Sequence, residues 1–268
     1  FYMSLHVIDE DQYVLGVIYP DATKETQIEI DWSLEASNTN CSNPKKIISP
    51  TRYIFIFLRT LANPNDPKDL ERAHNLQRCV QVEQSNRGEF QIPKWDPKSL
   101  AKCRQAITAL VSCIKPGVEV NGYRCKVEPT HQLIGTAGGW GGLPQHDAAY
   151  QVFFPPKDKE DLVYYIKVDP KTVPIDSKAF WSITVYNKDS YLEYNNHDSY
   201  SLNSLTAKKE TDGTYILYFS SEEKRKKDSM PNWIRTFPGW NYLVRLYKPK
   251  EEVINLEWQF PELLLQKE

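Results

Sequence analysis

Residues 237–249 read FPGWNYLVRLYKP, and three similar runs precede them: AFWSITVYN at residues 179–187, NNHDSYSLNS at 195–204 and DGTYILYFS at 212–220. Each run is short, rich in aromatic and β-branched residues, and bounded by Asp-Gly, Pro-Gly or Asn-rich segments. Such runs are typical of consecutive antiparallel strands joined by turns. The stretch from Ala179 to Pro249 therefore predicts a compact β-sandwich or jelly roll.

The N-terminal part of the chain predicts further strands. Aromatic and β-branched residues mark segments 2–8, 13–19, 27–34 and 53–58. The last segment, YIFIFL, is continuously apolar rather than alternating, so it predicts a central strand that is buried on both faces. Residues 37–50 are rich in Asn, Ser, Lys and Pro and predict a surface loop.

Two helices are predicted between the β-rich parts of the chain. Pro67 precedes residues 68–82, where apolar side chains recur at helical spacing. A second helix is expected over residues 97–114, because Pro116 and the glycine after it end the pattern. Its apolar stripe contains Cys103 and Cys113, which predicts that these two thiols are buried and inert.

These segments predict a mainly β, multidomain protein with three domains. An N-terminal β-sandwich portion is expected at residues 1–62, a helical connector subdomain at 63–130, and a C-terminal jelly-roll domain at 131–268. With 268 residues, the chain can bury a core without cross-links.

The composition excludes several classes of protein. The formal net charge is -2, so the basic character of a nucleic-acid-binding protein is missing. No apolar run approaches the length of a membrane span, and the composition is that of a soluble protein without an assigned compartment. The five cysteines form no CxxC pair, so we expect no zinc site and favour free thiols, with one or two disulfides as the alternative.

Arg245 is the strongest candidate for a binding residue. Strand alternation puts it on the same face as Leu243 and Tyr247, and we expect its guanidinium to lie in the interior of the jelly roll. A guanidinium between apolar residues needs a carboxylate or carbonyl partner, because an unpaired buried charge is costly. The position of Arg245 therefore predicts one of two roles. The side chain either holds the carboxylate or phosphate of a ligand, or forms an internal ion pair with an Asp or Glu of the same domain.

Arg59 and several aromatic residues are the other candidates. Arg59 ends the apolar strand at the expected domain junction, where it could line a pocket or form an ordinary ion pair. The aromatic residues could line a pocket for a flat or sugar-like ligand, or they could fill the core. This aromatic set contains Trp140, Trp181, Trp233, Trp240, Tyr186, Tyr242 and Tyr247.

Other kinds of chemistry find little support in the sequence. The glycine-dense segment GTAGGWGGLPQHDAAY at residues 135–150 lacks the spacing of a phosphate-binding loop, and we expect its glycines to permit close packing near Trp140. The five histidines are scattered, and Ser182 lies inside a strand rather than on a sharp turn. The basic run at residues 224–227 is flanked by acidic residues and predicts a solvated loop.

Several spaced motifs carry a family resemblance. They are Phe180-Trp181-Ser182-x-Thr184-x-Tyr186, Asp212-Gly213, Asn232-Trp233 and Leu243-x-Arg245-Leu246-Tyr247-x-Pro249, with Leu143-Pro144 and Asp147-Ala148-x-Tyr150 before them. Together they resemble the module called domain of unknown function 1214. Arg59-Thr60, Asp69, Ala73 and Gln77 resemble the end of its usual partner, domain of unknown function 1254. The resemblance implies a partial immunoglobulin-like sandwich, a helical connector and a C-terminal jelly roll, and it implies no reaction.

The chain departs from the family pattern in three places. Asn196 and Ser199 stand where the family has proline and arginine, and Arg235 stands where Asn-Trp-Leu-Pro would end in proline. The front strands of the first module, with an Asn-x-Asp-Thr segment, have no counterpart here.

We expect a protein that binds or acts on a small anionic or aromatic molecule in a pocket near the domain junction. The alternative is a structural, assembly or surface-recognition module without catalysis, which can form a homo-oligomer. No catalytic residue or cofactor is assigned, and no metal, nucleic acid or membrane span is expected. The candidate ligand-binding residues are Arg245, Arg59, Trp181, Tyr186, Tyr247, Asn232 and Trp233.

Overall fold

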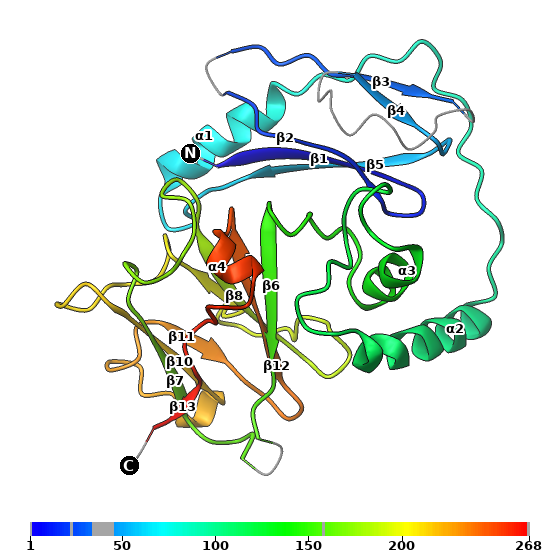
Figure 1. Ribbon diagram of the computed structural model, residues 1–268. Coiled ribbons are helices and arrows are strands. Elements are labelled where there is room, and N and C mark those ends of the chain that lie inside the picture. Colours follow the sequence, from blue (N-terminus) through cyan, green and yellow to red (C-terminus); the bar gives the residue numbers. More distant parts are fainter. Residues whose placement is uncertain (1, 22–23, 34–45, 157–158, 267–268) are drawn as a thin grey trace. The chain divides into compact units, whose positions relative to one another are not determined.

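The computed structural model describes residues 2–21, 24–33, 46–156 and 159–266. The chain forms two compact units, Phe1–Gln145 and His146–Glu268 (Figure 1). The fold is mostly β, with 28% strand and 18% helix, which confirms the predicted class. The finer division into three domains stays a prediction.

The first unit contains two small sheets. Strands β1 (Met3–Asp9), β2 (Val14–Ile18) and β5 (Ile54–Thr60) form an antiparallel sheet in the order β2-β1-β5. Strands β3 (Glu29–Trp32) and β4 (Lys46–Ser49) form a parallel pair. Val7, Ile18 and Ile47, from three of these strands, share a small core, as expected for a partial sandwich. Cys41 and most of the predicted loop at 37–50 lie outside the described residues.

Strand β5 differs from its prediction. It contains most of the YIFIFL run, but it lies at the edge of its sheet and pairs only with β1 among the described strands. Phe55 is 49% exposed and Ile56 is 43% exposed, so neither face of the strand is fully covered. The expectation of a central strand buried on both faces is wrong, because continuous apolarity measures hydrophobicity and not sheet position.

The helices begin as their sequences predict. In α1 (Pro67–Arg78) and α2 (Pro97–Ala109), Pro is the first residue and the preceding side chain, Asp66 or Asp96, accepts a backbone hydrogen bond from the first turn. Each carboxylate caps its helix and satisfies one otherwise free N–H group. A short 3-10 helix, η1 (Leu110–Cys113), continues α2. Helix α3 (Pro129–Gly138), capped by Glu128, was not predicted and takes up the start of the glycine-dense segment.

Helix α2 has no buried residue, which corrects a second expectation. Leu100 is 53% exposed, and Cys103 and Cys113 are exposed free thiols, as are Cys79 and Cys125. The apolar spacing of residues 97–114 predicts that Cys103 and Cys113 are buried, and this prediction is wrong. Spacing defines a face but not the element that covers it.

Gly141 shows why the glycine-dense segment needs a residue without a side chain. Its φ of +70° is in the left-handed region, and a Cβ atom there would lie 2.8 Å from Cζ of Phe57. Trp140, the preceding residue, packs against Phe57 with ring centroids 5.6 Å apart. The prediction of close packing near Trp140 is confirmed at this position.

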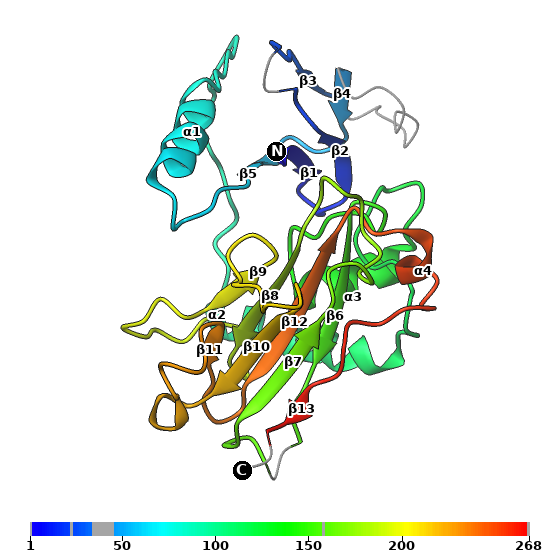
Figure 2. The ribbon, with the colours of Figure 1, turned by 90° about the vertical axis from the view of Figure 1, so that its left-hand side faces the viewer.

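The second unit is a sandwich of two four-stranded sheets (Figure 2). One sheet has the order β6-β12-β8-β9 and the other β11-β10-β7-β13. The strands are β6 (Ala148–Phe153), β7 (Tyr164–Val168), β8 (Trp181–Tyr186), β9 (Ser201–Asn203), β10 (Tyr215–Ser220), β11 (Trp233–Arg235), β12 (Asn241–Tyr247) and β13 (Leu264–Leu265). The pairing is antiparallel except between β10 and β11. The unit also contains the 3-10 helix η2 (Glu222–Lys224) and the short helix α4 (Glu251–Ile254).

Alternating residues of both sheets form one core in this unit. On β12, Trp240, which precedes it, Tyr242, Val244 and Leu246 are all at most 2% exposed and face inward. Burial raises the pKa of the Tyr242 phenol. This alternation confirms the face assignment predicted from the sequence.

None of the described helices is long and apolar enough to cross a lipid bilayer.

Candidate functional site

Arg245 lies on the outward face of the β6-β12-β8-β9 sheet. Its neighbours on β12 alternate between the core and this face, and Arg245 itself is half-buried. The guanidinium donates hydrogen bonds to Thr184 Oγ1 (3.1 Å) and to Tyr186 Oη (2.7 Å), both on β8. Its carbon lies 5.8 Å from the centre of the Tyr186 ring. The expectation that Arg245 points into the sandwich interior is therefore wrong.

The two groups that hold Arg245 are neutral. Among the described residues, no Asp or Glu forms an ion pair with this guanidinium. The internal ion pair considered from the sequence is thus absent from the described part of the chain. A half-buried cation held only by hydroxyl groups keeps an uncompensated positive charge.

Strand register surrounds Arg245 with apolar and aromatic residues. Arg245 pairs with Tyr150 of β6 on one side and Ser182 of β8 on the other, and Leu243 pairs with Val152. Tyr150 is 39% exposed and Val152 is 55% exposed. We call the outward-facing set Tyr150, Val152, Thr184, Tyr186, Leu243 and Arg245 the Arg245 face. The motifs around Tyr150, Thr184 and Arg245 are far apart in sequence and meet here.

Tyr247 shares the outward side of β12 with Arg245. Its ring stacks on Phe180, with centroids 4.2 Å apart and an interplanar angle of 18°. This stacking fixes the end of the strand two residues from the guanidinium. Tyr247 and Tyr186 are thus the predicted aromatic residues that share a sheet face with Arg245.

The other predicted residues of the second unit have different surroundings. Trp181 is 1% exposed and belongs to the core. The side chain of Asn232 is also buried; it accepts from Lys208 N and donates to the carbonyl oxygens of Lys208 and Ile216. It cross-links two segments of the unit. Trp233 lies on β11, in the opposite sheet from Arg245.

Arg59 belongs to the first unit and is also held without a carboxylate. Its guanidinium contacts His6 Nδ1 (3.3 Å) and Gly141 O (3.4 Å), and its carbon lies 4.8 Å from the centre of the Phe57 ring. No described Asp or Glu forms an ion pair with it. The prediction that it lines a ligand pocket stays a prediction.

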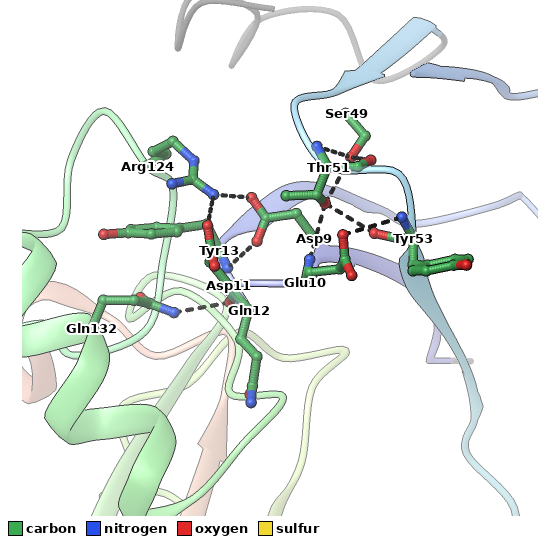
Figure 3. A network of polar contacts seen from close by, with 10 residues as sticks. All are labelled: Asp9, Glu10, Asp11, Gln12, Tyr13, Ser49, Thr51, Tyr53, Arg124 and Gln132. Carbon is green, nitrogen blue, oxygen red and sulfur yellow. Dashed lines mark hydrogen bonds and ion pairs between the residues drawn. The ribbon is translucent and has the colours of Figure 1, made fainter. Parts of the chain in front are cut away.

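A polar network in the first unit was not predicted from the sequence (Figure 3). Arg124 contacts the carboxylates of Asp9 (2.5 Å) and Asp11 (2.9 Å), and its guanidinium carbon lies 4.2 Å from the centre of the Tyr13 ring. Burial raises the pKa of the Asp9 carboxyl, and Arg124 opposes that rise. The backbone N–H of Tyr13 donates to Asp9 Oδ1 (2.9 Å). Since its charges are paired internally, this network is a structural cross-link between the β1–β2 hairpin and the segment before α3.

No group of three or more His, Cys, Asp or Glu among the described residues is arranged to hold a metal ion. A shallow, open hollow follows one side of α1 and is lined by Lys68, Glu71, Arg72, Asn75, Leu76 and Cys79. All of its lining residues belong to α1 or its C-cap, so it does not form a closed site.

Comparison with known families tests the resemblance to domain of unknown function 1214. Residues 155–251 match the model of a family described as "Protein of unknown function (DUF1214)". The match covers β7 to β12, with Thr184, Tyr186 and Arg245, and confirms the resemblance for this stretch. It covers less than half of the chain, and it carries no activity.

Solved structures were compared with this chain as well. The VPA0106 protein from Vibrio parahaemolyticus has a TM-score of 0.63 at 17% identity, over 99% of this chain and 82% of that chain. A putative uncharacterized protein from Burkholderia cenocepacia has a TM-score of 0.49 at 14% identity, over 99% of this chain and 69% of that chain. A comparison with curated proteins finds no match. The first of these similarities shows that a bacterial protein shares the fold.

Proposed function

We propose that the second unit binds a small molecule in which a carboxylate adjoins an aromatic or apolar part, and that the Arg245 face is its site. One observation carries the proposal: the half-buried guanidinium of Arg245 is held by Thr184 and Tyr186 and has no acidic partner among the described residues. A ligand carboxylate would supply the missing charge.

The arrangement also suits the shape of such a ligand. A guanidinium has five N–H groups, and two hydrogen bonds hold Arg245 in place, so donors remain for a two-point contact with a carboxylate. Tyr150, Val152 and Leu243 lie next to it by strand register and are exposed or half-buried. These side chains would cover the apolar part of the ligand.

Titration with benzoate, followed by backbone amide NMR, tests this proposal, with benzamide as the uncharged analogue. We expect benzoate to shift the signals of β8 and β12 and benzamide to shift them much less. The Arg245→Met substitution should weaken benzoate binding by about tenfold or more, because a hydrogen bond to a charged group contributes about 1.5–3 kcal/mol. Arg245→Lys should restore part of the affinity.

A matched control is Lys167→Met, which removes an exposed cation from the opposite sheet. It should leave benzoate binding unchanged. Equal shifts with benzoate and benzamide, or equal benzoate affinity in wild type and Arg245→Met, would contradict the proposal.

We also infer that residues 59–77 correspond to the end of a module like domain of unknown function 1254. Arg59 and Thr60 end β5, and Asp69 accepts from the Asn63 backbone (2.7 Å) near the start of α1. Ala73 is the buried residue of that helix. These observations support a structural role for the motif, since the hydrogen bond between Asn63 and Asp69 fixes the connection from β5 to α1.

The β5 edge favours a second candidate function, which is assembly with another copy of this chain. An edge strand offers unpaired N–H and C=O groups, and natural proteins usually protect such an edge with charges or proline. Between Ile54 and Leu58, β5 has neither, and Phe55 and Ile56 are exposed. Two antiparallel copies of β5 would continue the sheet across a two-fold axis.

Native mass spectrometry of wild type and Ile56→Lys tests assembly. We expect a dimer for wild type and mainly monomer for the variant, because a lysine on the edge opposes strand pairing. Leu133→Lys, at a residue of α3 that is 54% exposed, is the control and should remain dimeric. A monomeric wild-type protein would exclude this function.

A further inference from the structure

Trp233 of β11 is the centre of a cluster of cationic groups, in the opposite sheet from Arg245. The indole is 6% exposed, and its Nε1–H donates to Ser220 Oγ (2.9 Å), which fixes the ring. The guanidinium carbon of Arg225 lies 4.3 Å from the ring centre. The imidazole of His197 meets the ring edge-on, with centroids 5.5 Å apart. The ring therefore orients one guanidinium and contacts one imidazole.

The loop that carries His197 is fixed to β11. Asn195 Oδ1 accepts from the backbone N–H groups of His197 (3.1 Å) and Ser199 (3.0 Å). Ser199 Oγ donates to Trp233 O (2.9 Å) and accepts from Arg235 N (3.0 Å). Ser199 and Arg235, two positions where the chain departs from the family pattern, are thus in direct contact. These bonds hold His197 and the backbone of Arg235 in one place.

Two guanidinium groups of this cluster have no ion pair among the described residues. Arg225 contacts the Trp233 ring, and its Nε–H is buried without a described acceptor. The guanidinium carbon of Arg235 lies 5.8 Å from the centre of the Phe237 ring. Aromatic rings orient arginine without neutralising its positive charge.

The carboxylate of Glu222 interacts with all three of these groups. Its Oε1 lies 2.7 Å from His197 Nε2. The hydrogen bond from His197 lowers the pKa of Glu222, and the charges of Arg235 and Arg225 lower it further. Both guanidinium groups therefore act electrostatically on this carboxylate. Counted together, two arginines and one glutamate leave one excess positive charge even when His197 is neutral.

The structure also changes the interpretation of the basic run at residues 224–227. Lys224 pairs with Asp161 (2.7 Å), but Arg225 turns back onto Trp233. Lys226 and Lys227 are exposed beside it. The run is therefore not a uniform solvated loop, because one of its cations is part of the Trp233 cluster.

We propose that Arg225, Arg235 and His197 form a binding site for a tetrahedral oxyanion, that is, a phosphate or sulfate group. Arg225 and His197 contact the same ring, Trp233, and Arg235 lies on the same strand as that ring. A tetrahedral oxyanion offers acceptor oxygens to several donors at once, whereas a carboxylate offers two. Glu222 occupies part of the cluster and opposes the incoming anion. The site is separate from the Arg245 face, since β11 and β12 belong to different sheets.

The test is an NMR titration of the full chain with inorganic phosphate, sulfate and O-phosphoserine at constant ionic strength. We expect phosphate to shift the amide signals of His197, Ser199 and Arg235. Arg225→Gln and Arg235→Gln should each weaken binding by about tenfold, and Glu222→Gln should strengthen it. Tighter binding of O-phosphoserine than of phosphate would identify a phosphate group on a larger molecule, and equal binding would identify the free ion.

Lys167→Gln is the control, because this exposed lysine belongs to the same unit but pairs with Asp212. It should leave phosphate binding unchanged. Far-ultraviolet circular dichroism checks that each variant is folded. If Arg225→Gln does not fold, Arg225→Lys provides a milder substitution at the same position. The proposal is wrong if millimolar phosphate leaves these amides unshifted, or if the shifts persist equally in Arg225→Gln and Arg235→Gln.

Discussion

Replacing Arg124 with Gln is expected to lower the free energy of unfolding of the first unit by about 3–5 kcal/mol, because the substitution leaves a buried carboxylate unpaired. The side chain of Asp9 is fully buried, and Arg124 contacts it as well as Asp11. The arginine also covers the Tyr13 ring, so packing is lost with the charge. Urea denaturation, with hydrogen exchange of the β1 amides to identify the unit, measures the loss.

The loss should depend on pH. Burial raises the pKa of Asp9 above 3.8 in the wild type although Arg124 opposes the rise, so removing Arg124 raises that pKa further. A carboxyl whose pKa is higher in the folded than in the unfolded state contributes stability that is fully present below the unfolded value and is lost as the pH rises through the folded value. The variant should therefore be weakest relative to wild type at neutral pH, and the difference should shrink toward pH 3.8.

Two further variants check the cause. Adding Asp9→Asn to Arg124→Gln should recover most of the lost stability, since no buried charge remains. Arg78→Gln, at an exposed arginine of α1, should change the stability by at most about 0.5 kcal/mol. A stability difference that is the same at neutral pH and near 3.8 would show that lost packing, and not the Asp9 charge, is the cause.

The second unit could be predicted well because its signals are local. Asp212-Gly213 marks a turn before β10, and aromatic and β-branched alternation marks β8 and β12. Each of these patterns depends on residues within one strand. Strand β6 was not predicted, since it directly follows the glycine-dense segment and its residues Ala148 and Ala149 have little strand preference.

The errors in the first unit have a common physical origin. The residues of β5 and α2 are apolar at the right spacing, but burial depends on which element covers them. Neither the edge position of β5 nor the exposed face of α2 is encoded in the spacing of its own residues. The sequence predicts which side of an element is apolar, and only tertiary structure decides whether it is covered.

Some residues of the candidate sites could be selected from the sequence, and others could not. Arg245 and Tyr186 could be selected from the sequence, because strand alternation and a family motif single them out. Arg225 could not, since it lies in a charged run and only its contact with Trp233 distinguishes it from its lysine neighbours. Arg124 could not be selected from the sequence either, because its partners Asp9 and Asp11 are more than a hundred positions away.

Replacing Trp181 with Ala is expected to destabilise the second unit by about 3–5 kcal/mol, which is typical for a large buried aromatic side chain. Trp181 is 1% exposed and packs edge-on against Tyr215 and Phe260, with centroids 5.5 Å and 5.6 Å away. It is next to Ser182 in sequence, but the two residues face opposite sides of β8. Thermal and urea denaturation measure the loss.

This variant separates the two roles considered for the aromatic residues. A core role predicts a large loss of stability, an intermediate loss in Trp181→Phe, and unchanged benzoate affinity in Trp181→Phe. A ligand-contact role predicts the reverse, with near-normal stability and weakened binding.

Phe154→Ala is the matched control, because Phe154 is an aromatic residue of the same unit that is 74% exposed. Its replacement should lower the free energy of unfolding by at most about 0.5 kcal/mol. Since Arg245 lies on the outward side of the same sheet, a stable Trp181→Ala protein with impaired benzoate binding would contradict the assignment of opposite faces on which the Arg245 face depends.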